Sequence, residues 1–131
     1  MSLRPGFSII IPTFNRAFCI CEAVDSVLMQ NYPDFELIVV DDGSSDGTDM
    51  LLKERYGAEM ACGRLKYLQS GHEGVSAARN KGLRAATREW AGYLDTDNRM
   101  CADYFAVFEN AVRTGGAKCY YCLLYTSPSP R

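Results

Sequence analysis

Two clusters of acidic residues are the groups in this sequence best suited to chemistry. The first is Asp41-Asp42-Gly43-Ser44-Ser45-Asp46, and the second is Asp95-Thr96-Asp97. Each follows a short apolar run of the kind that forms a buried strand. In an open α/β sheet, ligands bind in the crevice outside the carboxyl ends of the strands, so carboxylates from two strand ends can converge on one ligand. Two such clusters favour a bound cation or a ligand rich in hydrogen-bond donors.

The second cluster has the composition of a metal site. Asp95 and Asp97 are two positions apart at the end of a predicted strand, where side chains point the same way, roughly 6.5 to 7 Å apart. Mg²⁺ or Mn²⁺ binds carboxylates together with phosphate oxygens. We therefore predict that Asp97 holds a divalent cation and that Asp95 contacts ribose or metal. A solvated loop explains most isolated Asp-x-Asp pairs, and only the position after the apolar run 90–94 strengthens the prediction.

The first cluster and the end of the first strand indicate nucleotide binding. Asp42 can accept a hydrogen bond from a base N–H, and the hydroxyl of Thr13 can hold the base edge. Asp41 is a further candidate for the same site, although capping or turn formation is the competing interpretation for Asp41 and Asp46. The other candidates in the strand-end segment are Pro12, Asn15 and Arg16.

Arg79 is the candidate cation for a diphosphate, because a guanidinium can pair with phosphate through two hydrogen bonds. A structural ion pair between Arg79 and one of the clustered aspartates is the competing interpretation.

Strand-type and helix-type segments alternate along the chain. This alternation predicts a parallel sheet with helices on both faces, joined by right-handed crossovers. The predicted strands are 7–11, 36–40, 65–69, 90–94 and 117–124, and the predicted helices are 16–30, 50–57, 75–87 and 101–112.

Composition excludes several classes of protein. The 131 residues carry a net charge of −2, so no general positive field attracts nucleic acid. No apolar stretch approaches the ~20 residues of a membrane span, and the N-terminus lacks a signal-peptide pattern. We expect a cytoplasmic protein. A full-length form could also be located at the inner face of the membrane. The six cysteines are scattered, and we interpret them as reduced core thiols.

The four motifs together resemble family 2 glycosyltransferases of GT-A fold. The resemblance covers residues 7 to about 113 through the segments 10–16, 39–48, 78–83 and 95–97. It implies a Rossmann-like three-layer sandwich with a mostly parallel central sheet, incomplete at the C-terminus. It also implies an inverting transferase in which Thr13 and Asp42 bind the base of a nucleotide sugar, expected to be a UDP-sugar. Neither a G-x-G-x-x-G after the first strand nor a P-loop motif is present, which disfavours other nucleotide-binding classes.

The same resemblance implies that a second half is missing. Family members carry an acceptor-binding half with an Asp or Glu general base, and nothing after Asn98 resembles it. We expect residues 1–121 to form the nucleotide-sugar half-domain and residues 122–131 to be a non-native or disordered tail. The general base would then lie beyond the chain end and the fragment alone would be inactive. In the full-length protein the acceptor would be a saccharide or a lipid-linked molecule. A non-catalytic nucleotide-sugar-binding remnant is the alternative.

Overall fold

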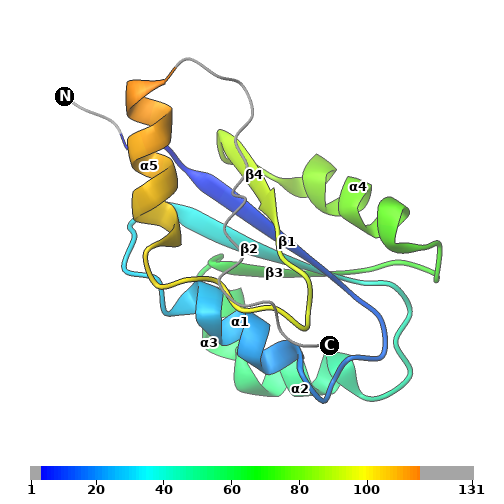
Figure 1. Ribbon diagram of the computed structural model, residues 1–131. Helices are drawn as coiled ribbons and strands as arrows, with labels where there is room; N and C mark the ends of the chain where they lie inside the picture. Colours follow the sequence, from blue (N-terminus) through cyan, green and yellow to red (C-terminus); the bar gives the residue numbers. More distant parts are fainter. Residues whose placement is uncertain (1–3, 116–131) are drawn as a thin grey trace, which may run out of the picture.

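The computed structural model describes residues 4–115. The strands are β1 (Phe7–Thr13), β2 (Phe35–Asp41), β3 (Leu65–Gln69) and β4 (Trp90–Tyr93). The helices are α1 (Ile20–Leu28), α2 (Thr48–Arg55), α3 (Gly57–Ala61), α4 (Val75–Ala85) and α5 (Tyr104–Thr114). Figure 1 shows the sheet between α4 on one face and the other helices on the opposite face. The predicted α/β sandwich is therefore confirmed.

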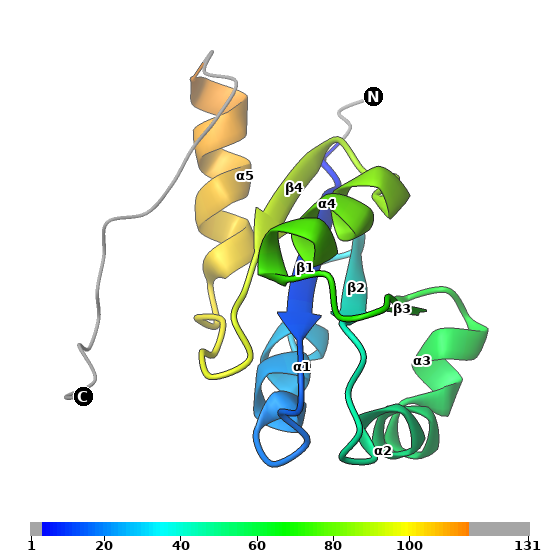
Figure 2. The same cartoon turned by 90° about the vertical axis from the view of Figure 1, so that its right-hand side faces the viewer.

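The sheet is parallel throughout, with the strand order β3-β2-β1-β4. The chain builds the sheet outward from β1 through β2 to β3 and then returns to place β4 on the other side of β1, as Figure 2 shows. The order reverses between β1 and β4, which makes this the topological switch point. In open α/β sheets, the carboxyl edge at such a point is where ligands bind.

The two central strands are buried over their whole length. Successive side chains of a strand point to opposite faces, so one apolar run supplies two cores. Ile9 and Leu37 belong to the larger core, which includes residues of α1 and α5, whereas Ile10 and Ile38 pack with Ala78 of α4. The predicted continuous apolar strands are thus explained by burial on both faces.

Helix α4 packs against the sheet through small residues. A Cβ atom added to Gly82 would lie 2.5 Å from Cγ2 of Ile10 and 3.2 Å from Cγ2 of Val40. Both neighbours belong to the buried core, so neither has free space into which it can move. The glycine fixes the distance between helix and sheet, and with it the position of the residues that begin α4.

We predict that Gly82→Ala destabilises the protein. Overpacking a core costs about 1–3 kcal/mol, which exceeds the gain of up to about 1 kcal/mol from better helix propensity. Urea unfolding should show a net loss of roughly 1 kcal/mol. The control is Asn80→Ala, since Asn80 is exposed on the same helix and its replacement should slightly stabilise. A Gly82→Ala variant as stable as wild type would contradict the packing argument.

A buried carboxylate, that of Glu36, stabilises the amino end of strand β2. Glu36 is 1% exposed and lies 2.8 Å from Nζ of Lys66. It also accepts hydrogen bonds from Oγ of Ser8 at 2.6 Å and from the backbone N–H of Thr87 at 2.7 Å. Burial alone would raise the pKa of Glu36, but these partners together lower it from 4.5 to about 2. The charged form is therefore the stabilising one.

We predict an acid-sensitive contribution from Glu36. A carboxyl pKa depressed by folding stabilises the protein fully above its unfolded value near 4.5, and the contribution is lost as the pH falls toward about 2; its size is roughly 3 kcal/mol. Glu36→Gln should lower stability at pH 7 and flatten the decline between pH 5 and pH 2.5 in urea titrations. Glu89→Gln, at an exposed position, should leave the wild-type profile unchanged; an unaltered profile in Glu36→Gln would refute the assignment.

The prediction that the first strand stops at Pro12 is wrong, since β1 continues to Thr13. The carbonyl of Ile10 accepts the N–H of Leu94, so positions 10 and 12 both face β4. The register with β4 ends at Tyr93. Proline's missing N–H therefore leaves no ladder bond unmade, and the strand can pass through it.

Several helix boundaries also differ from the prediction. Helix α1 begins at Ile20 instead of 16, and the residues before it form a turn in which the carbonyl of Arg16 accepts the N–H groups of Cys19 and Ile20. Tyr56 breaks the predicted helix 50–57, and the following residues form α3, which was not predicted. The predicted strand 117–124, the domain boundary at 121 and the tail 122–131 lie outside the described residues.

The described residues bear on two properties that composition predicted, the lack of a membrane span and the state of the cysteines. None of the helices in residues 4–115 is both long and apolar enough to cross a bilayer. The thiols of Cys19, Cys21, Cys62 and Cys101 are free, in agreement with reduced cysteines. Cys62 and Cys101 are exposed, however, so the prediction that they are core residues was wrong.

Candidate functional site

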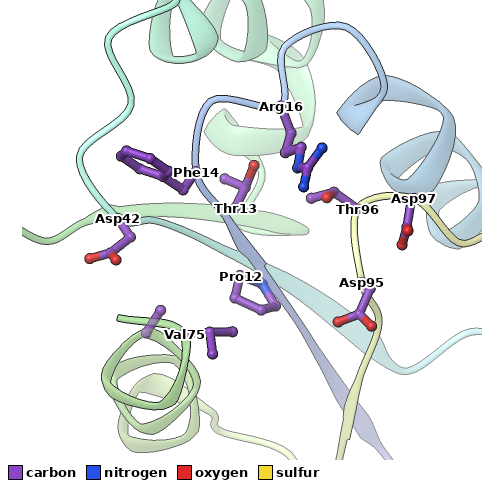
Figure 3. A pocket seen from close by; sticks show the side chains of 10 residues that line it. Pro12, Thr13, Phe14, Arg16, Asp42, Val75, Asp95, Thr96 and Asp97 are labelled. Carbon is purple, nitrogen blue, oxygen red and sulfur yellow. The ribbon is translucent and has the colours of Figure 1, made fainter. Parts of the chain in front are cut away.

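A cavity of about 370 Å³ lies at the carboxyl edge of the sheet, at the switch point between β1 and β4. Figure 3 shows its side chains converging from three strand ends and from the start of α4. Its size is within the range of small-molecule sites. The lining residues are Pro12, Thr13, Phe14 and Arg16 after β1, Asp42 after β2, Asp95, Thr96 and Asp97 after β4, and Val75 and Ala78 on α4.

Asp42 is the most strongly held group of the cavity. It is 4% exposed, and its Oδ1 accepts hydrogen bonds from Oγ of Ser70 at 2.8 Å and from the N–H of Glu73 at 2.7 Å. Its Oδ2 accepts the N–H of Gly74 at 2.9 Å. Burial alone would raise the pKa of Asp42, but these donors lower it below its usual value. The carboxylate is therefore ionised and fixed, with acceptor capacity left on Oδ2.

The residues around Asp42 include an unsatisfied hydroxyl and an aromatic pair. Oγ1 of Thr13 is buried and has no hydrogen-bond partner among the described residues. A buried polar atom without a partner costs about 1–3 kcal/mol, so a ligand that supplies one is favoured. Phe14 stacks on His72 with ring centroids 4.3 Å apart, and Nδ1 of His72 lies 3.7 Å from Oδ2 of Asp42. Together these groups suit a planar ligand with polar edges.

The acidic pair lies on the opposite side of the cavity, and its local geometry differs from the prediction. Asp95 and Asp97 both line the cavity, but they lie in a turn in which the N–H of Asn98 donates to the carbonyl of Asp95 at 3.1 Å. The expected extended strand does not reach them, because β4 pairs with β1 only through Tyr93. The two carboxylates are brought to one cavity by a turn and not by strand alternation.

Arg79 forms the ion pair with a clustered aspartate that was the competing interpretation of this residue. Its Nη2 lies 3.3 Å from Oδ1 of Asp95, and its guanidinium carbon is 5.7 Å from the ring centre of Tyr93. It does not line the cavity. Its Nε is buried without a hydrogen-bond partner within residues 4–115. Arg79 therefore acts here as a partner for one carboxylate of the acidic pair.

Two other predicted site residues are likewise absent from the cavity lining. Asp41 is 1% exposed and accepts hydrogen bonds from the N–H of Ser44 at 2.9 Å and from the hydroxyl of Tyr67. Burial and this contact raise the pKa of Tyr67. Asn15 accepts the N–H of Ser45 at 2.8 Å through Oδ1. Both side chains are used within the protein, whereas Pro12, Thr13, Arg16 and Asp42 line the cavity.

Four cavity residues were not predicted. They are Phe14, Val75, Ala78 and Thr96. Phe14 and Thr96 lie inside the motifs 10–16 and 95–97, so their positions in the sequence could have indicated that they belong to the site. Val75 and Ala78 are ordinary helix residues whose role follows only from the packing of α4 against the carboxyl edge.

We predict that Asp42→Asn releases the loop before α4. An amide can accept through only one of its two head-group atoms, so its NH₂ would face an N–H donor of Glu73 or Gly74. Amide hydrogen exchange should therefore rise at residues 70–74, with a stability loss of about 1–2 kcal/mol. Ser70→Ala, which removes one bond and keeps the carboxylate, should change exchange at Glu73 and Gly74 far less. Equal exchange in both variants would contradict the anchoring role of Asp42.

An open parallel sheet with an acidic cavity at its switch point defines an α/β protein suited to nucleotide binding. The Glycosyl transferase family 2 model matches residues 8–130, and the chain belongs to that family. One relative is the GalNAc(5)-diNAcBac-PP-undecaprenol beta-1,3-glucosyltransferase of Campylobacter jejuni, which is 31% identical over 123 residues, or 92% of this chain.

Solved structures share the fold of this chain. The structure of S. aureus TarS residues 1–349 matches 82% of this chain with a TM-score of 0.73 and 29% identity. The mannosyltransferase PcManGT from Pyrobaculum calidifontis, in complex with GDP-Man and Mn²⁺, matches 86% with a TM-score of 0.72 and 32% identity. The chain spans 32% of each of these two structures and 39% of the Campylobacter protein, and only 15% of a longer relative from Rickettsia felis.

Proposed function

We propose that this chain is the sugar-donor-binding region of an inverting, metal-dependent glycosyltransferase that uses a nucleoside diphosphate sugar. The observation that carries the proposal is the division of one cavity into two ends. Asp42 lies at one end, its neighbour Thr13 lies between the two ends, and the acidic pair of Asp95 and Asp97 lies at the other end. A nucleotide sugar has the same order of groups, with a base, a ribose and a diphosphate that needs cations.

The Asp42 end is suited to a nucleobase. The open acceptor position on Oδ2 can take one base N–H, and the unpartnered hydroxyl of Thr13 can bond to a neighbouring base edge. We favour uracil, which presents a single ring N–H, and hence a UDP-sugar. Support also comes from relatives, because TarS has been solved with UDP-GlcNAc.

The acidic end is suited to a divalent cation bound together with a diphosphate. Within residues 4–115, no cluster of three or more His, Cys, Asp or Glu side chains could hold a metal ion by itself. Two carboxylates in one cavity fit Mg²⁺ or Mn²⁺ nevertheless, because these ions take one or two protein carboxylates and complete their shell with phosphate and water. Asp97 would hold the ion, with Asp95 on the ion or the ribose, and Mn²⁺ is present in the related mannosyltransferase complex.

The residues of this chain would divide the work of sugar transfer. A bound cation would offset the charge that develops on the leaving nucleoside diphosphate. Arg16, whose guanidinium faces the cavity in Figure 3, would add a second positive charge beside the diphosphate. Inversion requires an acceptor hydroxyl to attack the anomeric carbon while a carboxylate base takes its proton. We assign that base to a part of the full-length protein outside this chain. The acceptor would be a saccharide or a lipid-linked molecule. The cytoplasmic location stays a prediction.

We predict that calorimetry on the chain shows UDP binding that depends on Mn²⁺. Asp97→Asn should weaken binding in Mn²⁺ by at least about tenfold, equivalent to about 1.4 kcal/mol, and leave the metal-free affinity unchanged. Asp103→Asn is the matched control, since Asp103 is exposed shortly after the acidic pair. Absence of UDP binding by the folded chain, or equal Mn²⁺ dependence in Asp97→Asn, would reject the proposed function.

A non-catalytic nucleotide-sugar-binding module is the second candidate, because the cavity offers groups for a donor and the described residues include no assigned general base. An assay of product formation from labelled UDP-sugar and mixed acceptors separates the two candidates. Turnover above the background given by Mn²⁺ alone would exclude the module. Binding without turnover in a longer form that carries the acceptor region would exclude the enzyme.

A further inference from the structure

Hydrogen bonds from the loop after β2 hold the backbone on both sides of Arg16. The residue before it, Asn15, donates its N–H to Oγ of Ser44 at 2.8 Å and accepts the N–H of Ser45 at 2.8 Å. The residue after it, Ala17, donates its N–H to Oδ2 of Asp46 at 2.9 Å. We name the side chains of Asn15, Ser44 and Asp46 the loop clasp.

The backbone before Arg16 has a conformation that the clasp helps to hold. Asn15 has a φ of 53°, in the left-handed region that non-glycine residues adopt infrequently and that asparagine tolerates better than most. The chain therefore turns sharply between the end of β1 and Arg16. This turn directs the guanidinium of Arg16 into the cavity, as Figure 3 shows, while the side chains of Asn15 and Asp46 stay outside it.

We propose that the loop clasp is a positioning device that holds Arg16 toward the diphosphate of the sugar donor, an inference that rests on the proposed function. None of the clasp side chains lines the cavity, so they act only through the orientation of the long and otherwise mobile side chain of Arg16. A flexible cation loses conformational entropy when it binds phosphate. Fixing its backbone beforehand reduces that loss, and the benefit is specific to the diphosphate.

The clasp can be separated from the structural role of Asp46. Its two carboxylate oxygens have different partners, since Oδ2 accepts from Ala17 whereas Oδ1 accepts from Oγ1 of Thr48 at 2.5 Å and from the N–H of Thr48 at 3.3 Å. Thr48 begins α2. Thr48→Val therefore removes the hydroxyl bond on the helix side and leaves the bond to Ala17 in place, which makes it the matched control.

The test compares UDP with uridine, both in Mn²⁺, for Asp46→Ala and Asn15→Ala. We expect the Kd for UDP to rise about five- to tenfold in each variant and the Kd for uridine to stay within twofold of wild type. Asn15→Asp keeps an acceptor and tolerates the left-handed φ, so it should restore most of the UDP affinity. Thr48→Val should lower stability with little change in either Kd.

A double-mutant cycle with Arg16→Ala tests whether the clasp acts through Arg16. In the Arg16→Ala background, Asp46→Ala should cause no further loss of UDP affinity. Additive losses, equal losses for uridine and UDP, or an equal effect of Thr48→Val would each overturn the proposal.

Amide hydrogen exchange of the nucleotide-free chain provides a measurement that does not depend on binding. Exchange across residues 14–19 should rise at least tenfold in Asp46→Ala and stay at the wild-type level in Thr48→Val. Failure of wild type to bind UDP would count against the proposed function, whereas unchanged exchange in Asp46→Ala would by itself overturn the clasp.

Discussion

The parallel pairing of β1 with both β2 and β4 is the constraint on which the rest of the structure depends. Parallel pairing places the carboxyl ends of all three strands at one edge. The chain leaves β1 toward β2 and later returns to its other side, so loops from well-separated segments meet there. The polar groups of the cavity come from these loops and from Thr13 at the end of β1, whereas the apolar residues of the strands contribute position and not chemistry.

The cavity depends on two further layers of support. Helix α4 reaches the carboxyl edge because Gly82 allows it to lie against Ile10, and the loop before α4 is tied to Asp42 by two backbone N–H groups. The same carboxylate therefore shapes the cavity and offers an acceptor to a ligand. On the other side, hydrogen bonds from the loop after β2 hold the turn that carries Arg16. The contacts that hold the fold at this edge therefore also shape the cavity.

Sequence patterns alone determined the fold class and the place of the site, with several of its residues. Continuous apolar runs at β1 and β2 predicted strands buried on both faces, because alternate side chains of one strand fill two cores. Acidic and polar residues directly after those runs predicted a site at the carboxyl edge, and Asp42, Asp95 and Asp97 do line one cavity. These inferences needed only local periodicity and the topology rule for parallel sheets.

Only the tertiary structure decided what each polar side chain does. Asp41 and Asp42 are neighbours in sequence, yet the pleat sends one to Tyr67 and the other to the cavity. Asn15 and Arg79 have side chains suited to ligands, but Asn15 accepts a hydrogen bond from Ser45 and Arg79 forms an ion pair with Asp95. The turn at the acidic pair likewise depends on where β4 loses its pairing with β1. Such roles are set by contacts between residues far apart in the chain, which local patterns do not contain.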